Sequence, residues 1–310
     1  MHITILIPTY NEHENIDDLL SNINNELVDE YKKHSFEILF IDNNSIDGTQ
    51  DKLRSIAKER KDIKVILNKK NFGPNRSCFY GLMQVKSDAA IILPADLQVP
   101  IKVVPNLVNE LQKGNDVVLV KRKNSDEFFL MKYLRSFFYK IVNKFSESKL
   151  IENATGDGIY SKYAISQLKK FYDPYPFTRG LILEVGLKIS TVEYNHQLRS
   201  KGNSSYNFIS YFEEGIMGFV KHSRYFLRLM ILVGFLLSFI SFVIAVIYLI
   251  YKILYWDTFS LGAAPMIIGL FGLGSFQLLL IGVLGEYSLT ILDYVKKFPL
   301  VIEKERINFD

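Results

Sequence analysis

The sequence predicts an α/β domain built on a parallel sheet with helices on both faces, followed by a pair of membrane-spanning helices. In roughly the first 120 residues, five short apolar runs alternate with segments of helix length, and this alternation favours a parallel sheet. Two stretches without charge follow, Leu229 to Tyr251 and Thr258 to Gly285. Each is long enough to cross a bilayer, which takes about 20 residues of helix.

The α/β elements are expected in strict alternation. The expected strands are 3–7, 36–41, 63–67, 89–93 and 116–120, and the expected helices are roughly 12–33, 49–60, 74–85 and 100–113. Open α/β sheets bind their ligands at the carboxyl ends of the strands. The segments after the strands, among them PTYNE (8–12), DNNSIDGT (42–49) and PADLQVP (94–100), are rich in Asp, Asn, Gly and Pro, which suits loops with a polar site.

Two amphipathic segments are expected next to the membrane. Residues 128–145 place Lys132, Lys140 and Lys144 on one helical face opposite a very apolar one, which is typical of a helix in the membrane interface. The alternative is a core helix of the globular domain. Residues 208–220 carry a similar apolar stripe and lead into the first span.

The short connection between the spans predicts an antiparallel hairpin with both chain ends on one side of the membrane. Basic residues in the outer flanks outnumber the single Lys252 of the turn, which places both flanks in the cytoplasm. The expected organisation is an α/β domain (1–206), a juxtamembrane amphipathic helix (207–228), a hairpin (229–285, with spans at about 229–251 and 259–285) and a cytoplasmic tail (286–310).

Composition excludes several other classes of protein. The net charge of +4 is too small to indicate a nucleic-acid partner. The single cysteine, Cys78, excludes an internal disulfide and a cysteine metal cluster.

Two carboxylates stand at expected strand ends. Asp42 closes the second strand and Asp96 follows the fourth, so both are expected at one edge of the sheet. A nucleoside diphosphate needs an acceptor for its base or ribose and a ligand for the cation that neutralises its phosphates. The alternative for each Asp is a turn or helix cap.

The motifs themselves resemble glycosyltransferase family 2, the inverting nucleotide-sugar transferases of the GT-A (Rossmann-like) fold. The resemblance is carried by Pro8-Thr9-Tyr10-Asn11-Glu12, by Asp42 with Ser45 and Asp47-Gly48-Thr49, by Asn71-Phe72-Gly73, and by Ala95-Asp96-Leu97-Gln98. Two later stretches resemble the polyprenyl-phosphate branch of the family. They are Arg199 to Asn207, similar to an R-x-x-G-x-S-x-Y element, and Gly285-Glu286-Tyr287 at the end of the second span.

The resemblance implies roles for particular residues. Asp96 and Gln98 match the positions that bind the divalent metal, Mg²⁺ or Mn²⁺, and the diphosphate. Pro8, Tyr10, Glu12 and Asp42 match the nucleotide pocket. Asp157, counted with Asp96 as catalytic, matches the acidic residue of the acceptor site. The positions that match acceptor-phosphate binding are Arg122, Arg199, Ser204 and Ser205.

The implied reaction transfers one sugar, with inversion, from a nucleotide sugar (UDP-sugar favoured) to a polyprenyl phosphate, with undecaprenyl expected. The resemblance also implies that the protein is a homo-oligomer and a multi-pass protein of the bacterial cell membrane. A lipid phosphate is already an anion near pH 7 and needs positioning more than deprotonation, and arginine suits it because its planar fork binds two oxygens.

Departures from the family pattern keep alternatives open. Pro94 replaces the first Asp of D-A-D-L-Q, Asn43 and Asn44 follow Asp42, and Gly158-Ile159 replaces Phe-Arg after Asp157. Ser125 stands where a second Arg often follows Arg122. Pro94 and the missing arginines support a catalytically degenerate member that acts as a nucleotide- or lipid-binding partner. A processive polysaccharide synthase would carry a Q-x-x-R-W motif, but the only tryptophan, Trp256, lies in the hairpin turn.

Overall fold

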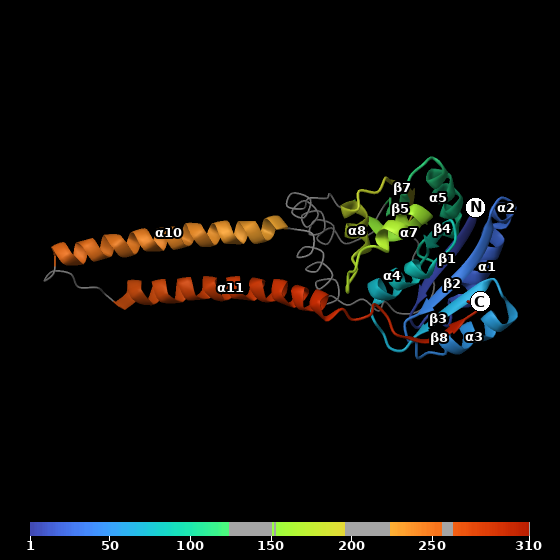
Figure 1. The fold of residues 1–310 in the computed structure, drawn as a ribbon, viewed down its shortest axis with the longest axis horizontal. Helices are drawn as coiled ribbons and strands as arrows, with labels where there is room; N and C mark the ends of the chain where they lie inside the picture. Colours follow the sequence, from blue (N-terminus) through green and yellow to red (C-terminus); the bar gives the residue numbers. More distant parts are fainter. Residues whose placement is uncertain (124–150, 152, 196–223, 256–262, 310) are drawn as a thin grey trace.

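A computed structural model of the protein describes residues 1–123, 151, 153–195, 224–255 and 263–309. Figure 1 shows an α/β domain at one end and two long helices that project from it. The predicted interfacial segments, 128–145 and 208–220, lie outside the described residues, and so do residues 256–262 between the two long helices.

An eight-stranded sheet forms the centre of the domain, with the strand order β7-β5-β6-β4-β1-β2-β3-β8. Its strands are β1 (His2–Thr9), β2 (Ser35–Asp42), β3 (Ile63–Asn68), β4 (Ala89–Ile92), β5 (Val117–Arg122), β6 (Ala154–Ser161), β7 (Ile189–Tyr194) and β8 (Glu303–Ile307). The first five coincide with the strands expected from the sequence, because a strand covered on both faces reads as a continuous apolar run.

The sheet is mixed, which corrects the expectation of a parallel one. Strands β4, β1, β2 and β3 are mutually parallel, and β5 pairs with β7 in parallel. However, β6 lies antiparallel between β4 and β5, and β8 lies antiparallel along β3. The insertion of β6 matters for the site, because the beginning of this strand lies at the same edge as the carboxyl ends of β4 and β5.

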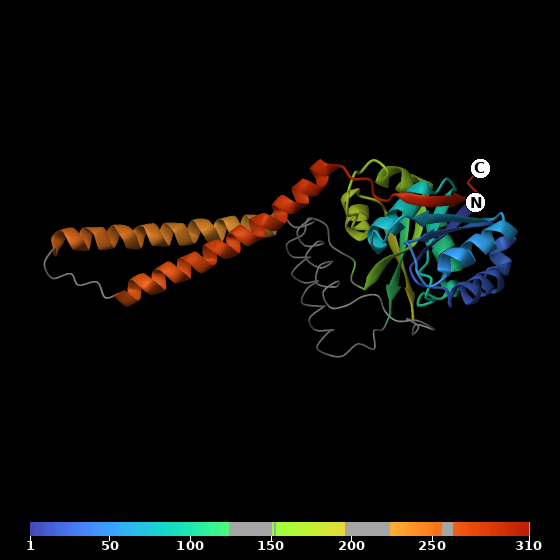
Figure 2. The ribbon, with the colours of Figure 1, turned by 90° about the horizontal axis from the view of Figure 1, so that it is seen from below.

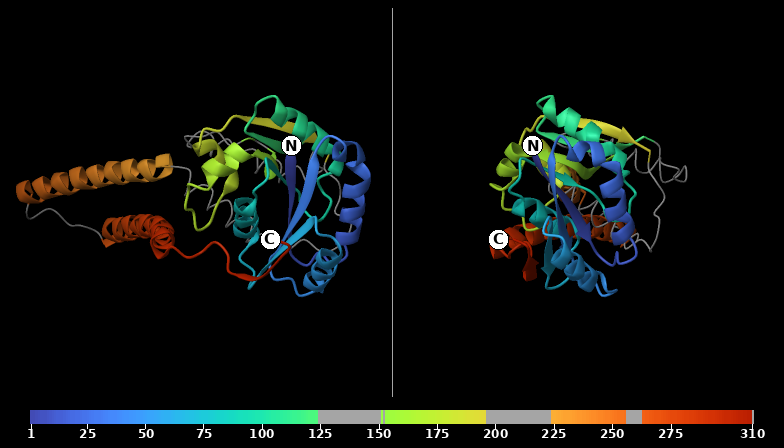
Figure 3. Two further views of the ribbon diagram at one scale, coloured as in Figure 1. Left: turned by 45° about the vertical axis from the view of Figure 1, so that its right-hand side comes forward. Right: turned by 90° about the vertical axis from the view of Figure 1, so that its right-hand side faces the viewer.

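Helices cover both faces of the sheet, as predicted (Figures 1 and 3). The described helices of the domain are α1 (Ile16–Glu26), α2 (Val28–Tyr31), α3 (Thr49–Glu59), α4 (Pro74–Gln84), α5 (Val104–Gln112), α7 (Lys162–Leu168) and α8 (Thr178–Glu184). The expected helix 12–33 is divided at Leu27, and the expected helix 100–113 opens with a 3₁₀ turn at Ile101–Val103.

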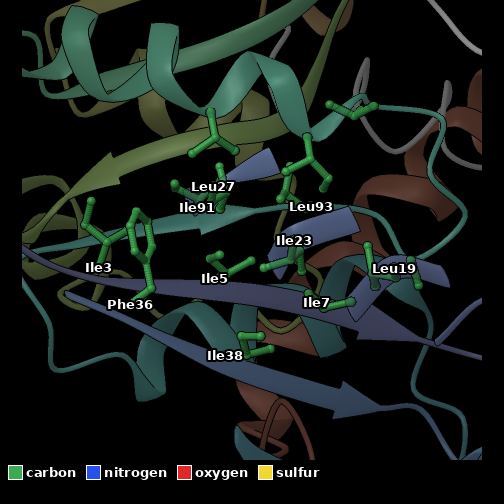
Figure 4. Packing of buried hydrophobic residues seen from close by; sticks show 14 of the residues in the cluster. Ile3, Ile5, Ile7, Leu19, Ile23, Leu27, Phe36, Ile38, Ile91 and Leu93 are labelled. Carbon is green, nitrogen blue, oxygen red and sulfur yellow. The ribbon is translucent and has the colours of Figure 1, made fainter. Parts of the chain in front are cut away.

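The alternation of side chains along each strand divides the core into two clusters. On one face, Ile3, Ile5 and Ile7 of β1 pack under α1, α3 and α5, as Figure 4 shows for α1. On the other face, Leu6 of β1 packs with residues of α4, α7 and α8. Both clusters are almost fully buried, so the sheet is a rigid platform for the loops at its edge.

The two long helices are α10 (Arg224–Leu254) and α11 (Ala263–Lys296). Figures 1 and 2 show α10 leading away from the domain and α11 returning alongside it. By length and composition, one described helix segment, Gly272–Lys296, is apolar enough to cross a membrane, and Ile231–Ile244 is a shorter apolar segment. Many of their large apolar side chains are exposed; Phe235, for example, is 74% exposed.

The chain after α11 returns to the α/β domain and completes its sheet. Residues 303–307, expected in a tail, form β8 along the edge of β3. Arg76 of α4 donates from Nε to the Leu300 carbonyl (3.0 Å) and from Nη2 to the Pro299 carbonyl (2.9 Å). The amide of Asn308 donates to the carbonyl oxygens of Ala57 and Ile63, at 2.7 and 2.8 Å. The last residues of the chain therefore belong to the folded domain.

We expect a chain that stops after Lys297 to lose much of its stability. It would lose the strand pairing of β8, the burial of Val301 and the contacts of Arg76 and Asn308. Burial of one valine and several hydrogen bonds are together worth roughly 3–6 kcal/mol. For a domain of this size that corresponds to a melting temperature lower by at least about 6 °C.

Thermal unfolding in detergent measures this loss, and a chain that stops after Phe309 is the matched control. Addition of a synthetic peptide of residues 298–309 should restore part of the lost stability by pairing with β3. If both truncated chains had the melting temperature of the full chain, β8 would contribute nothing to the stability of the fold.

Candidate active site

The polar loops expected at the strand ends meet at one edge of the sheet. In the register of the parallel strands, Thr9 of β1 pairs with Asp42 of β2, and Leu6 pairs with Ile92 of β4. The segments after β1, β2 and β4 therefore leave the sheet side by side, which confirms that the motifs beginning at Pro8, Asp42 and Pro94 share one edge.

The loops after β1 and β2 are tied together by hydrogen bonds. The Asn11 amide donates to Ser45 Oγ (2.8 Å), and the Ile46 amide donates to Asn11 Oδ1 (3.0 Å). The Glu12 amide donates to Thr49 Oγ1 (3.1 Å). Asn11 holds a left-handed φ of 58°, which asparagine adopts more readily than most residues. These bonds give the edge a fixed shape without a ligand.

Asp42 is fully buried, and its carboxylate is bound by its own loop. It accepts hydrogen bonds from the Ser45 amide (2.9 Å), from Ser45 Oγ and from Thr9 Oγ1 (3.2 Å). Burial raises the pKa of Asp42, and these hydrogen bonds oppose the rise. The carboxylate thus fixes the loop 42–49 against the end of β1.

The other residues predicted for the nucleotide pocket lie around this loop. Pro8 and Tyr10 are partly exposed at the end of β1, and Glu12 is partly exposed in the following turn. The carboxylate of Glu12 accepts a hydrogen bond from Asn15 Nδ2. The structure therefore groups Pro8, Tyr10 and Glu12 beside the buried Asp42.

Asn43, one of the departures from the family pattern, joins three segments. Its backbone amide donates to the Thr9 carbonyl (2.9 Å), and its side chain donates to Asn71 Oδ1 (2.7 Å). Its Oδ1 accepts from Asn68 Nδ2 (3.2 Å) and from the Phe72 amide (2.9 Å). An amide both donates and accepts, whereas an ionised Asp only accepts, so the bonds as they stand here suit an Asn at this position.

Asp96 and Gln98 lie in the loop after β4, and both are partly exposed. The Gln98 backbone amide donates to Asp96 Oδ1 (3.1 Å). Leu97 between them has a φ of 60°, an uncommon value for a branched side chain. The sharp turn and this hydrogen bond hold the two predicted metal-binding residues in one short loop.

The strand β6 brings Asp157 to Asp96. Gly158 pairs with Ile92 of β4 on one side and with Leu119 of β5 on the other. Asp157 therefore stands at the edge where β4 ends, shortly before the loop that carries Asp96. Two carboxylates far apart in the sequence share one site because β6 is inserted between β4 and β5.

The charges around Asp157 act on one another. Burial raises the pKa of Asp157, and the negative charge of Asp96 raises it further. The guanidinium groups of Arg179 and Arg122 oppose this rise. The site thus combines two carboxylates with two guanidinium groups, in a partly buried place where charges interact more strongly than in water.

Arg122 lies at the end of β5, opposite Tyr194 of β7 in the register. Burial raises the pKa of Tyr194, and the neighbouring positive charge of Arg122 lowers it. Neither Tyr194 nor Arg179 was expected from the sequence as a site residue; Arg179-Gly180 resembles a turn of the family, and that motif was the only available signal. Arg199, Ser204 and Ser205 lie outside the described residues, and their roles stay predictions.

We expect Gly158→Ala to disrupt the site by disrupting the sheet. Gly158 has a φ of +142°, and an added Cβ would stand 2.1 Å from the Val118 carbonyl oxygen. Strain and overpacking together predict a loss of roughly 2–6 kcal/mol in unfolding free energy. Denaturant unfolding measures it.

The matched control is Gly186→Ala, at a φ of +72° with open space around it, which should cost only about 1–2 kcal/mol. Equal losses for the two variants would show that the close approach of β5 and β6 is unimportant.

Residues 4–168 match the profile of Glycosyl transferase family 2. The protein belongs to glycosyl transferase family 2. The match contains Asp42, Asp96, Arg122 and Asp157 and ends before α8, so Arg179 and Tyr194 lie beyond it. The mixed sheet and its two helical layers form the GT-A-like fold of this glycosyltransferase.

Similar proteins extend over the whole chain of this family 2 glycosyltransferase. The bactoprenol glucosyl transferase of Shigella phage SfX is 30% identical over 99% of this chain and 100% of its own. The prophage bactoprenol glucosyl transferase homolog of Escherichia coli is 29% identical over 98% and 99%. Among solved structures, a mannosyltransferase from Pyrobaculum calidifontis in complex with GDP-Man and Mn²⁺ is 17% identical, with a TM-score of 0.47, and covers 95% of this chain and 86% of its own.

The donor atoms at this edge suit a hard divalent cation. Within the described residues no cluster of three or more His, Cys, Asp or Glu side chains could hold a metal by itself. Asp96 and Gln98 nevertheless offer carboxylate and amide oxygens, and the negative charge of Asp157 lies near them. Mg²⁺ and Mn²⁺ take such oxygens together with phosphate oxygens and water, so a substrate diphosphate would complete the coordination.

Proposed function

We propose that this glycosyltransferase moves one sugar from a nucleoside diphosphate sugar, UDP-sugar in particular, to a polyprenyl phosphate. The observation that carries the proposal is the similarity to bactoprenol glucosyl transferases along the whole chain, including α10 and α11. Bactoprenol is a polyprenol, and undecaprenyl phosphate is accordingly the proposed acceptor.

The donor nucleotide is proposed to bind at the ends of β1 and β2. Pro8, Tyr10 and Glu12 are partly exposed there and would contact the base and ribose. Asp42 acts by fixing the loop 42–49, because its carboxylate is occupied by Ser45 and Thr9. We therefore propose Asp42 as a residue of the nucleotide pocket that also fixes the shape of its loop.

The diphosphate is proposed to lie over the loop after β4. Asp96 and Gln98 would hold Mg²⁺ or Mn²⁺ there together with phosphate oxygens. When bound, the cation supplies stabilisation of the negative charge that develops on the leaving diphosphate. Pro94 removes one carboxylate from this loop, but Asp157 supplies a second negative charge near Asp96.

The acceptor phosphate is proposed to bind beside Asp157 and Arg122, with Arg199, Ser204 and Ser205 as further ligands. An oxygen of the lipid phosphate attacks the anomeric carbon and forms the new C–O bond. The bond from that carbon to the diphosphate oxygen breaks on the opposite face, so the configuration inverts. Arg122 offsets the repulsion between the two anions, and no proton transfer is required of the protein.

We propose that α10 and α11 anchor the enzyme in the bacterial cell membrane as a hairpin, with the α/β domain in the cytoplasm. The exposed apolar side chains of both helices and the basic residues at their domain ends support this arrangement. An anchor of this kind brings the site to an acceptor whose tail is buried in lipid. A homo-oligomer stays a prediction from the family resemblance.

Incubation of the purified full chain with undecaprenyl phosphate and a panel of nucleotide sugars tests the function. We expect mass spectrometry to detect a polyprenyl phosphate that carries one sugar, with UDP-glucose as the first donor to try. The absence of any lipid-linked product with every donor, from a protein that still binds nucleotide, would favour the degenerate binding protein suggested by Pro94.

A further inference from the structure

Arg179 lies against the strand segment that carries Asp157. It is the second residue of α8, and its side chain is partly buried. Its Nη1 donates to the carbonyl oxygen of Ala154 at 3.3 Å. A Cβ built on Gly156 would stand 3.9 Å from its Cγ. The side chain therefore runs along residues 154–156, next to the acidic residue of the site.

The aromatic ring of Phe177 supports the guanidinium group. The Arg179 Cζ lies 5.0 Å from the centroid of this buried ring, a distance typical of a cation–π contact. Stacking restricts the rotamers of a long side chain, so less entropy is lost when the guanidinium group binds a ligand. Arg179 is thus preorganised beside Asp157.

The balance of charge in the site calls for a second cationic side chain. The described charges that act on Asp157 are one carboxylate, Asp96, and two guanidinium groups, Arg122 and Arg179. These four side chains sum to zero. The proposed reaction brings a diphosphate and a lipid phosphate together in this place. Among the described residues, these two arginines supply the positive charge that offsets them, in addition to a bound cation and the predicted Arg199.

We infer that Arg179 is a phosphate-binding residue of this glycosyltransferase, additional to Arg122. The inference rests on the proposed function. The phosphate it contacts belongs either to the donor diphosphate or to the acceptor lipid, and the chemistry of recognition is the same in both. A purely structural role, in which Arg179 only joins α8 to Ala154, is the competing explanation.

Two substitutions of the full chain separate these roles. Arg179→Met keeps the aliphatic stem over Phe177 but removes the charge, and Arg179→Lys keeps the charge but loses the planar fork. Arg60→Met is the matched control, because Arg60 pairs with Asp62 outside the site. Each variant is measured for its melting temperature, for UDP affinity by calorimetry and for the KM of undecaprenyl phosphate at saturating donor.

We expect Arg179→Met to weaken one of the two affinities by at least about tenfold, the effect of one charge-assisted hydrogen bond. Arg179→Lys should lie between Met and the wild type, and Arg60→Met should change neither affinity. A rise in KM for the lipid assigns Arg179 to the acceptor, whereas a loss of UDP affinity assigns it to the donor.

Unchanged affinities in Arg179→Met would overturn the inference. An equal fall in melting temperature for Met and Lys, with both affinities intact in the folded fraction, would establish the structural role instead. Failure of the proposed function is distinguishable from failure of this inference. If the wild type transferred no sugar to any polyprenyl phosphate, the proposed function would fail. The UDP affinities of the variants would still test whether Arg179 binds the donor phosphate.

Discussion

Replacement of Asp96 by alanine is expected to lower the rate of sugar transfer by at least about a hundredfold while the protein stays folded. Asp96 is partly exposed at the end of β4, and the one hydrogen bond described for its carboxylate is to the amide of Gln98 within its own loop. Its loss therefore costs little folding energy. In the reaction the alanine variant would lose the cation and therefore the stabilisation of the leaving diphosphate. Losses of this kind typically lower the rate by factors of about 10²–10³.

Single-turnover transfer at increasing Mg²⁺ or Mn²⁺ concentration measures this effect. Asp96→Asn is the stricter test of the carboxylate charge. It keeps the shape of the loop and an oxygen for the Gln98 amide but removes the charge. The control is Asp29→Ala, which removes an exposed carboxylate of α2 that pairs with Lys32. If Asp96→Ala kept the rate and the metal dependence of the wild type, Asp96 would have no role in cation binding.

The sequence predicts five of the eight strands of the sheet well because those strands are buried on both faces. Strands β1 to β5 are continuous apolar runs, and their ends were placed to within one or two residues. The other three strands lack that pattern. β6 (ATGDGIYS) contains two glycines, β7 (ISTVEY) is half polar, and β8 (EKERI) carries four charges in five residues. Such strands can be identified only from the structure, by the neighbouring strands with which they pair.

The site was predicted in its parts rather than in its geometry. Motif residues such as Asp96 and Asp157 were identified, but nothing in the spacing of the sequence places them together, because their proximity depends on the antiparallel insertion of β6. Asp42 was predicted for the nucleotide pocket, and the hydrogen bonds of its carboxylate within its own loop could not be read from the sequence. Arg179 was not expected as a site residue, because a lone arginine near a glycine gives no sign of the strand beside it.

Replacement of Asp157 by asparagine is expected to lower transfer by roughly a hundredfold and to change nucleotide affinity much less. Asp157 interacts with Asp96, Arg122 and Arg179, so its charge helps to hold both guanidinium groups in the site. Asparagine has nearly the same shape but pairs weakly with arginine. Two charge–charge interactions weakened together, at about 1.4 kcal/mol each in this partly buried place, correspond to this loss.

The pH dependence of Asp157→Asn separates positioning from proton transfer. A phosphate monoester has a second pKa of about 6, so the acceptor is already an anion at neutral pH and needs no general base. The acid limb of the rate profile should therefore follow the acceptor phosphate and persist in Asp157→Asn at a lower rate. A general base would give a different result, because the limb would disappear together with the carboxylate. Rates measured between about pH 5.5 and 8.5 with saturating donor decide between the two, and a limb that vanishes in the variant would assign Asp157 to proton abstraction.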